Sequence, residues 1–117
     1  MKMENVLVGV DMSLKIADFG FATKLSETLT KKAGTACYMA PEIHLKQPYE
    51  GTSVDVFSTG VILFMLVAAH SPFTTAEKTD NLYKLLACNR ADLFWKLVCK
   101  NKPSGESFFS EDFKELI

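Results

Sequence analysis

An acid, an aromatic residue and a glycine stand together at Asp18-Phe19-Gly20, directly after the short β-prone run Ser13-Leu14-Lys15-Ile16-Ala17. A carboxylate at the end of a strand can bind a hard cation, and a glycine lets the backbone turn sharply close to a bound ligand. These residue types therefore suit a metal-phosphate site. The tripeptide alone also fits a polar strand end followed by a turn, so the rest of the chain has to decide between the two interpretations.

A β-hairpin is predicted around this acid. Val6-Leu7-Val8 and Leu14-Lys15-Ile16 are β-prone, and residues 9–13 between them hold the glycine, aspartate and serine that favour turns. Such a hairpin places Asn5, just before the first strand, near Asp18, just after the second. Mg²⁺ takes few protein ligands and completes its coordination with phosphate and water. We therefore expect Asn5 and Asp18 to form a two-oxygen magnesium site.

Four motifs occur in the order and near the spacings of the C-terminal lobe of a eukaryotic protein kinase, and the chain resembles that family. They are Lys2-Met3-Glu4-Asn5, Asp18-Phe19-Gly20, Gly34 to Glu42, and Asp55 to Gly60. The resemblance implies a mainly α fold with a small β-hairpin, as in the large lobe of the α+β kinase fold. Residues 1–117 are then a partial kinase domain that starts after the catalytic aspartate, contains the activation segment and the central helix, and lacks the N-terminal lobe.

The resemblance also assigns roles to the residues of the first two motifs. Lys2 would contact the phosphate that is transferred, and Asn5 and Asp18 would hold Mg²⁺. Leu7 would lie against the adenine of ATP. The expected cofactors are therefore ATP and Mg²⁺, and the expected cofactor-binding residues are Leu7, Asp18, Phe19 and Gly20.

Thr35 lies in a Gly-Thr-x-x-Tyr pattern that is typical of kinases acting on serine and threonine. In that family the threonine bridges the phosphate-contacting lysine, here Lys2, and the catalytic aspartate, whereas tyrosine kinases carry different patterns at both places. The expected function is transfer of the ATP γ-phosphate to serine or threonine of protein substrates. Within the family, residues 55–73 are most similar to calcium/calmodulin-dependent kinases, although the usual Trp, Gly and Pro are replaced by Phe57, Ala69 and Ser71.

The central helix is predicted over residues 53–69, with Ser53 as its cap and Asp55 near its positive N-terminal end. Its apolar residues lie nearly all round, which predicts a buried helix. By resemblance, Asp55 hydrogen-bonds the backbone of the catalytic loop; a helix-terminal cap is the alternative, and the two roles can coexist. Gly60, inside this helix, is expected to have something packed against its backbone.

Residues 21–32 read as a loop, because they are polar, rich in Ser and Thr, and follow neither helical nor strand periodicity. A phosphate added there could pair with nearby lysines and order the loop. Lys31 occupies the position at which related kinases carry their activating threonine. The predicted regulatory phosphosite is therefore Thr30 or, failing it, Thr28. The alternatives are an unmodified solvated loop or one held by Glu27; Ser26 is a further hydroxyl in the segment.

Three further helices are predicted after Pro72, over residues 81–87, 92–99 and 111–117. Leucines and other apolar residues recur at helical spacing in the first two, and Ser110 can cap the last. Trp95 is expected to contribute to packing rather than to a ligand platform.

Composition limits which binding partners and which cellular compartment we expect. Of 117 residues, 48% are hydrophobic, which is enough for one core, and the net charge of −1 gives no field that would attract nucleic acid or an anionic membrane. The longest apolar run, residues 60–69, is shorter than the roughly 20 residues that a bilayer requires. Three cysteines, Cys37, Cys88 and Cys99, suit reduced thiols. We expect a cytoplasmic protein without a secretory signal that binds neither nucleic acid nor membrane.

Several parts of the kinase machinery are not in this sequence. In the family, the Gly-rich loop, the strand lysine with its glutamate, and the His-Arg-Asp run precede Lys2, and the arginine that pairs with Glu42 would follow Ile117. The chain is therefore expected to be an internal piece that is inactive by itself, with Glu42 lacking its partner. Two function classes stay open: a serine/threonine kinase, or a pseudokinase-like or truncated regulatory module that binds a regulatory protein without catalysis.

Overall fold

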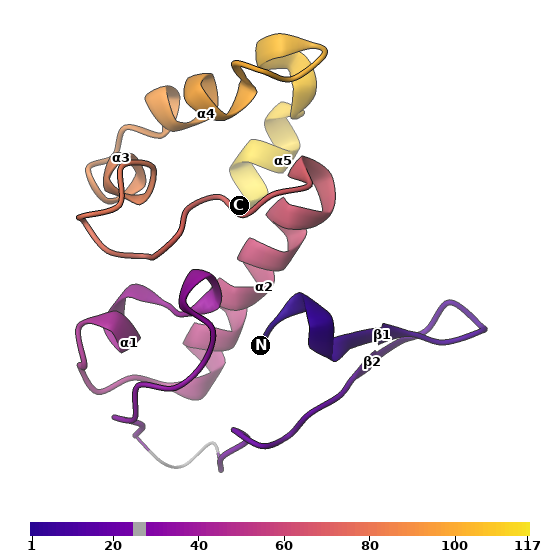
Figure 1. Ribbon diagram of the computed structural model, residues 1–117, viewed down its shortest axis with the longest axis vertical. Coiled ribbons are helices and arrows are strands. Elements are labelled where there is room, and N and C mark those ends of the chain that lie inside the picture. Colours follow the sequence, from indigo (N-terminus) through magenta and orange to yellow (C-terminus); the bar gives the residue numbers. More distant parts are fainter. Residues whose placement is uncertain (25–27) are drawn as a thin grey trace.

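The computed structural model describes residues 1–24 and 28–117, and its regular structure is mainly helical with one two-stranded hairpin (Figure 1). This confirms the predicted fold class. In chain order the elements are η1 (Met3–Asn5), β1 (Val6–Val8), β2 (Leu14–Ile16), η2 (Ala36–Tyr38), α1 (Pro41–His44), α2 (Gly51–Ala68), α3 (Tyr83–Ala87), α4 (Ala91–Cys99), η3 (Gly105–Phe108) and α5 (Glu111–Leu116).

The hairpin has the bounds that were predicted from the sequence. Strands β1 and β2 pair antiparallel, with Val6 opposite Ile16 and Val8 opposite Leu14. In the turn, the Asp11 carboxylate accepts hydrogen bonds from the backbone N–H and the hydroxyl of Ser13, at 3.1 and 2.7 Å. A Cβ at Gly9 would lie 2.7 Å from Oδ1 of Asp11 and 2.8 Å from Oγ of Ser13, so a larger residue there would displace these two side chains. The hairpin projects away from the helices (Figure 1).

Helix α2 begins at Gly51, two residues earlier than predicted, and Ser53 is therefore not its cap. The reason is a long-range contact. Leu29 and Tyr49 exchange backbone hydrogen bonds of 3.0 and 2.9 Å in an isolated antiparallel bridge, which holds the chain extended up to the N-cap residue Glu50. The helix ends one residue earlier than predicted, because Ala69 adopts the left-handed conformation with φ of 62°.

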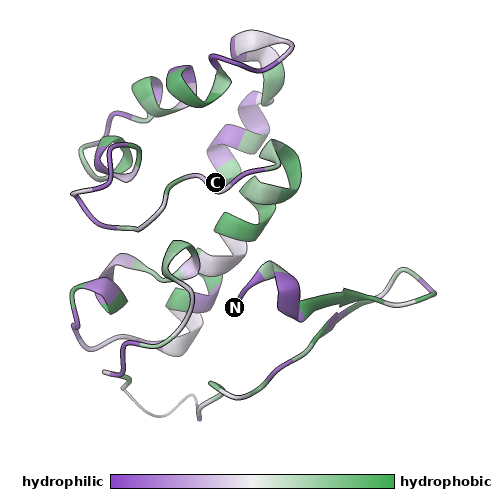
Figure 2. Ribbon diagram, viewed as in Figure 1, coloured by the Kyte–Doolittle hydropathy of each residue, from purple (hydrophilic) through white to green (hydrophobic). Residues whose placement is uncertain are grey.

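Three hydrophobic clusters pack against α2. Near its C-terminal end the aromatic cluster contains Phe64, Ala68, Phe94, Val98, Cys99 and Phe109, and the middle cluster contains Tyr38, Val61, Ile62, Phe73 and Ala76. Near its start, Val54 and Phe57 of the helix pack against a smaller cluster of Met39, Ala40 and Ile43. The remaining face is open, with Val56 73% and Leu66 65% exposed, so the prediction of a helix buried on all sides is wrong for the described residues. Figure 2 shows apolar residues along most of its length.

The length and composition of α2 would also allow it to cross a membrane, since its 18 residues have a mean hydropathy of 1.7. From the sequence, no membrane span was expected, because the apolar run of residues 60–69 is too short. Helix α2 is longer than this run, and residues 60–68 form only its second half. Core helices can meet the same criteria; 28% of this 18-residue stretch is buried, and all three clusters pack against it. We therefore treat α2 as the core helix of this fold.

The C-terminal helices surround the aromatic cluster. Trp95 lies 6.0 Å from Phe64 and 5.1 Å from Phe109 between ring centroids, which confirms its predicted packing role. The Ser110 hydroxyl accepts a hydrogen bond from the N–H of Phe113, as predicted for a cap. The helices themselves differ from the prediction by one or two residues at their ends. Lys102 donates to the Ala68 carbonyl and so covers the C-terminal end of α2.

Asp80 organises the segment between α2 and α3. Its carboxylate accepts hydrogen bonds from the backbone N–H groups of Thr74, Thr75, Leu82 and Tyr83, at 2.9 to 3.4 Å. Burial alone would raise the pKa of Asp80, but these hydrogen bonds outweigh burial and hold the pKa below its ordinary value. One charged side chain thus satisfies the backbone donors of a loop that has no regular structure of its own.

Replacing this carboxylate is expected to destabilise the fold. Asp80→Ala should lower the free energy of unfolding by about 1–2 kcal/mol at pH 7, as for loss of a helix-cap side chain. Because the folded-state pKa is depressed, the contribution is present above the unfolded pKa of about 3.9 and is lost as pH falls through the folded value. Urea denaturation from pH 7 down to pH 2.5 measures both effects. Glu115→Ala, at an exposed position of α5, serves as control. If the stability difference between wild type and Asp80→Ala did not diminish in acid, this role of Asp80 would be contradicted.

The expectation that something packs against Gly60 is wrong within the described part of the chain, where a Cβ built at Gly60 meets no heavy atom within 4 Å. Gly60→Ala is therefore expected to stabilise the chain by about 0.5–1 kcal/mol, because alanine loses less backbone entropy in a helix. Gly105→Ala is the matched control: its Cβ also has open space, but φ is +55°, so it should destabilise. Thermal and urea unfolding of both variants provide the measurement, and destabilisation by Gly60→Ala would reveal a contact that this structure lacks.

Candidate functional site

Asn5 and Asp18 lie side by side at the open end of the hairpin, as the sequence predicted. The Asn5 amide nitrogen donates to Oδ2 of Asp18 at 3.5 Å, and the backbone N–H of Ala17 donates to the Asn5 carbonyl at 2.8 Å. Local pairing at the end of β1 and β2 therefore fixes the two side chains together. An amide oxygen and a carboxylate are hard donors of the kind Mg²⁺ prefers, and the ion would need phosphate or water for its other positions.

The backbone at Asp18 is unusual, because φ is 63° at a residue that is not glycine. Aspartate tolerates this left-handed conformation when its short side chain bonds locally. Here Oδ1 of Asp18 accepts the backbone N–H of Gly20 at 3.1 Å, which leaves Oδ2 directed to Asn5. A Cβ at Gly20 would come 3.1 Å from the same Oδ1. The glycine thus keeps the space beside the carboxylate open, the role that its residue type suggested.

An open groove of about 770 Å³ lies between the hairpin, the segment after it and the start of α2. Most predicted site residues line it, namely Lys2, Asn5, Asp18, Phe19, Gly20, Thr35 and Asp55. Leu7, Glu42, Gly60 and the candidate phosphosites Thr28 and Thr30 do not line it. Leu7 is half exposed on β1, so its contact with adenine stays a prediction. Lys24 and Lys31 also line the groove and add positive charge to it, whereas the sequence had placed them only beside candidate phosphosites.

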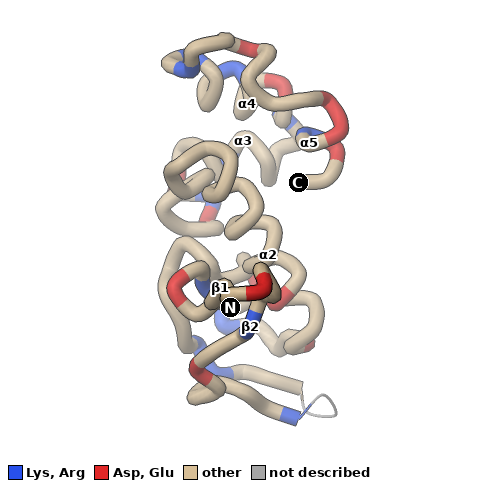
Figure 3. Tube along the Cα trace, turned by 90° about the vertical axis from the view of Figure 1, so that its right-hand side faces the viewer, with Lys and Arg blue, Asp and Glu red and all other residues tan. Residues whose placement is uncertain are grey.

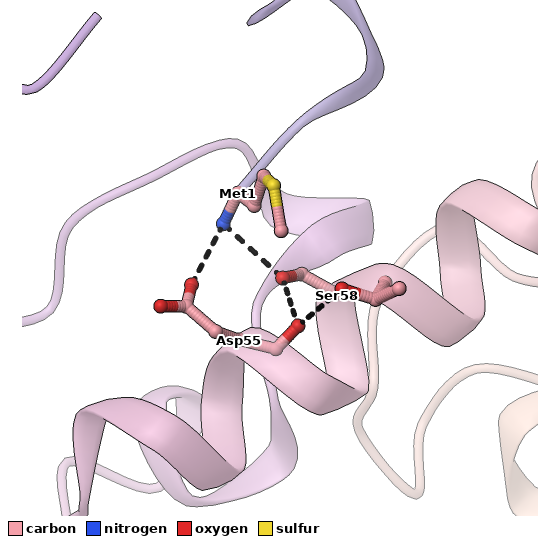
Figure 4. Close-up of polar contacts among 4 residues, drawn as sticks. Met1, Asp55 and Ser58 are labelled. Carbon is pink, nitrogen blue, oxygen red and sulfur yellow. Dashed lines mark hydrogen bonds and ion pairs between the residues drawn. The ribbon is translucent and has the colours of Figure 1, made fainter. Parts of the chain in front are cut away.

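Asp55 and Ser58 of α2 hold the start of the chain against the groove (Figure 4). The amino nitrogen of Met1 lies 3.4 Å from Oδ1 of Asp55 and 3.1 Å from Oγ of Ser58. The Ser58 hydroxyl donates in turn to the Asp55 carbonyl at 2.9 Å. Asp55 thus contacts the amino group of Met1, the residue before Lys2, and its hydrogen bond to the backbone of the catalytic loop stays a prediction. It lies in the second turn of α2 and is not a helix-terminal cap, because the helix begins at Gly51.

Thr35 is exposed on the opposite wall, and its carbonyl accepts the N–H of Tyr38 at 3.0 Å in the η2 turn. Tyr38 is 5% exposed and anchors this turn on α2 within the middle cluster. Burial raises the pKa of the Cys37 thiol, with a smaller effect from Glu4, which disfavours a reactive thiolate. Cys37 therefore fits the expected role of a small apolar residue.

The polar loop is confirmed for its described parts, in which the Leu29–Tyr49 bridge is the only regular pairing. The Tyr49 hydroxyl also donates to the Lys31 carbonyl at 2.8 Å. Thr28 and Thr30 are both exposed on either side of Leu29. Ser26 and Glu27 lie outside the described residues.

Glu42 is half-buried in α1, and no ion pair of its side chain is found within residues 1–24 and 28–117. Its charge contributes, after burial, to raising the pKa of Tyr83 on α3. The residue that sequence reasoning missed in this region is His44, two positions later. It is 7% exposed, and its Nε2 lies 3.1 Å from the Ala36 carbonyl. A single histidine outside the predicted helices and strands carries no pattern that would have indicated this contact.

Comparison of the sequence with known proteins shows the family of the chain. The model of the protein kinase domain matches residues 1–117. The chain is 36% identical over 122 residues to CBL-interacting protein kinase 9 of Oryza sativa subsp. japonica and 41% identical over 120 residues to the human SNF-related serine/threonine-protein kinase. All of the chain is covered in both comparisons, but it spans only 24% and 14% of those relatives. On this full-length match of its sequence, the chain belongs to the protein kinase family.

Proposed function

We propose that the protein to which these residues belong is a serine/threonine protein kinase that transfers the γ-phosphate of ATP to protein substrates. The observation that carries the proposal is the groove, because it gathers Lys2, Asn5 and Asp18 on one wall and Thr35 on the other. The family membership and the serine/threonine kinases among its relatives support the same reaction.

Phosphoryl transfer requires mainly positioning and charge stabilisation, and each residue of the groove would contribute one part of this. Asn5 and Asp18 would hold Mg²⁺, which when bound neutralises charge on the phosphates. Lys2 would contact the phosphate that is transferred, and Thr35 would bridge Lys2 and the catalytic aspartate that accepts the proton of the substrate hydroxyl. Asp55 would support Lys2 indirectly, because it lies beside Met1, the residue before that lysine.

A protein substrate and a cytoplasmic location complete the proposal, and a regulatory protein is a further expected partner. Nucleic acid and membrane surfaces are not proposed as partners. Figure 3 shows acidic and basic residues interspersed along the chain rather than gathered on one face, and the net charge is −1. The similarity of residues 55–73 to calcium/calmodulin-dependent kinases is kept as the proposed subgroup. The alternative is a pseudokinase-like or truncated regulatory module, which would bind partners without transferring phosphate.

Asp18→Asn in the full-length protein tests the catalytic proposal. We expect kcat to fall by roughly 10²–10³-fold, the usual cost of removing one transition-state charge contact. The melting temperature should move little, because the Asp18 side chain is exposed and only its hydrogen bonds at the hairpin end are affected. Phosphate incorporation into a serine/threonine peptide mixture and thermal unfolding are measured together.

Asp112→Asn is the matched control, since Asp112 is an exposed aspartate on α5 outside the groove. Equal loss of activity in both variants, or a collapse of the melting temperature with activity retained, would refute the role of Asp18. A wild-type protein that binds nucleotide but transfers no phosphate would favour the non-catalytic alternative.

We further propose that Thr30, or failing it Thr28, is the regulatory phosphosite. The bridge between Leu29 and Tyr49 holds this stretch extended, so both threonines face away from Leu29 and are exposed. Lys31 and Lys32 follow directly and could pair with an added phosphate. Lys31 occupies the position at which related kinases carry their activating threonine, and its positive charge cannot imitate a phosphate there.

Mass spectrometry of the protein from its native cells is expected to find phosphate on Thr30 or Thr28. Thr28→Ala and Thr30→Ala, made singly and together, should then lower kcat/KM, because the loop loses the charge that orders it. Ser107→Ala, an exposed serine on η3, is the control and should have no effect. Full activity of the double variant would mean that the loop needs no modification.

A further inference from the structure

The wall of the groove that carries Thr35 has little regular structure to hold it. Its two elements are η2, a three-residue turn, and α1, a single turn of four residues. Isolated helices this short are not stable in water, so tertiary contacts must maintain them. Apolar contact with α2 comes from Tyr38 in the middle cluster and from Met39 and Ile43, which pack with Val54 and Phe57 of that helix. The polar contact comes from His44, the last residue of α1.

The ring of His44 joins α1 back to η2. Its side chain is 2% exposed, and Nε2 lies 3.1 Å from the Ala36 carbonyl, one residue after Thr35. Because a carbonyl oxygen only accepts, Nε2 carries the hydrogen of this bond in either protonation state of the ring. The same carbonyl also accepts the N–H of Met39 at 3.3 Å. Both lone pairs of this oxygen are therefore used to hold the turn closed.

The other ring nitrogen faces a third segment. Nδ1 is buried without a hydrogen-bond partner among the described residues, and Oε2 of Glu77 lies 3.6 Å from it. Glu77 belongs to the loop that Asp80 organises, and the N–H of Asp80 donates to the Glu77 carbonyl at 2.9 Å. His44 thus lies where η2, α1 and the segment between α2 and α3 meet. A group buried at such a junction, with one nitrogen fully committed, has a defined orientation.

We propose that His44 is a positioning residue: its Nε2–H holds the Ala36 carbonyl and thereby fixes the turn that presents Thr35 and Tyr38 to the groove. In the protein kinase proposed above, on which the kinetic part of this inference rests, His44 sets the geometry of the substrate-binding wall without touching the reacting atoms. The wall that holds Asn5 and Asp18 does not depend on it, because hairpin pairing fixes those residues.

Two substitutions of His44 distinguish the effect of its hydrogen bond from the effect of its side-chain volume. In His44→Gln the side-chain amide nitrogen reaches about as far as Nε2 and can donate to Ala36. In His44→Asn the same amide is one methylene shorter and falls short of that carbonyl. Both variants are made in the full-length protein. Hydrogen exchange is followed by mass spectrometry on peptides covering residues 35–40 and, as an internal reference, residues 91–99 of α4.

His44→Asn should speed exchange in residues 35–40 by about 2- to 10-fold, the factor that one net hydrogen bond supplies, and leave residues 91–99 unchanged. KM for a serine/threonine peptide should rise by a similar factor while KM for ATP stays the same. His44→Gln should restore both quantities to within about twofold of wild type. Equal effects of Gln and Asn, no change in exchange with either, or a parallel rise in KM for ATP would overturn the inference. The expected exchange pattern in a protein that transfers no phosphate would support the positioning of the turn and count against the kinase proposal.

Discussion

Burial of side chains against helix α2 is the constraint on which the other elements depend. Phe64 is completely buried at the centre of the aromatic cluster, and a fully buried phenylalanine contributes about 1.5–3 kcal/mol. One turn earlier, Val61 and Ile62 receive Tyr38 from the η2 turn and Phe73 from the loop that follows the helix. The helix therefore connects the aromatic cluster with the groove, and Asp55 and Ser58 near its start hold Met1 beside that groove.

Polar side chains stabilise the loops by hydrogen bonds, as apolar packing stabilises helix α2. Asp11 closes the hairpin turn, Asp80 gathers the backbone donors of the segment before α3, and Tyr49 holds the Lys31 carbonyl. Each of these side chains satisfies backbone groups that no helix or strand pairs. Irregular segments can then hold fixed positions on the surface, which a binding groove requires of the loops that line it.

How well the sequence predicts a feature depends on how far apart in sequence the interacting residues lie. The hairpin, the proximity of Asn5 and Asp18, and the Ser110 cap depend on neighbours within about a dozen positions, and residue types alone indicate them. The start of α2 was misplaced because the Leu29–Tyr49 bridge is a contact across 20 positions. The open face of α2 and the space at Gly60 were missed because periodicity reports how apolar a helix is, and not which neighbours cover it. His44 gave no signal, since its partners are a carbonyl and a distant glutamate.

The two walls of the groove consequently have different physical origins. The wall of Asn5 and Asp18 is built by local hairpin pairing and a local side-chain bond that stabilises the positive φ at Asp18. The wall of Thr35 depends on Tyr38 packing on α2 and on contacts between segments far apart in sequence. The groove also combines carboxylates with lysines, as a cation bound together with phosphate requires. A perturbation of the core should therefore displace the wall of Thr35 before the wall of Asn5 and Asp18, and these two proposed metal ligands should keep their geometry longest.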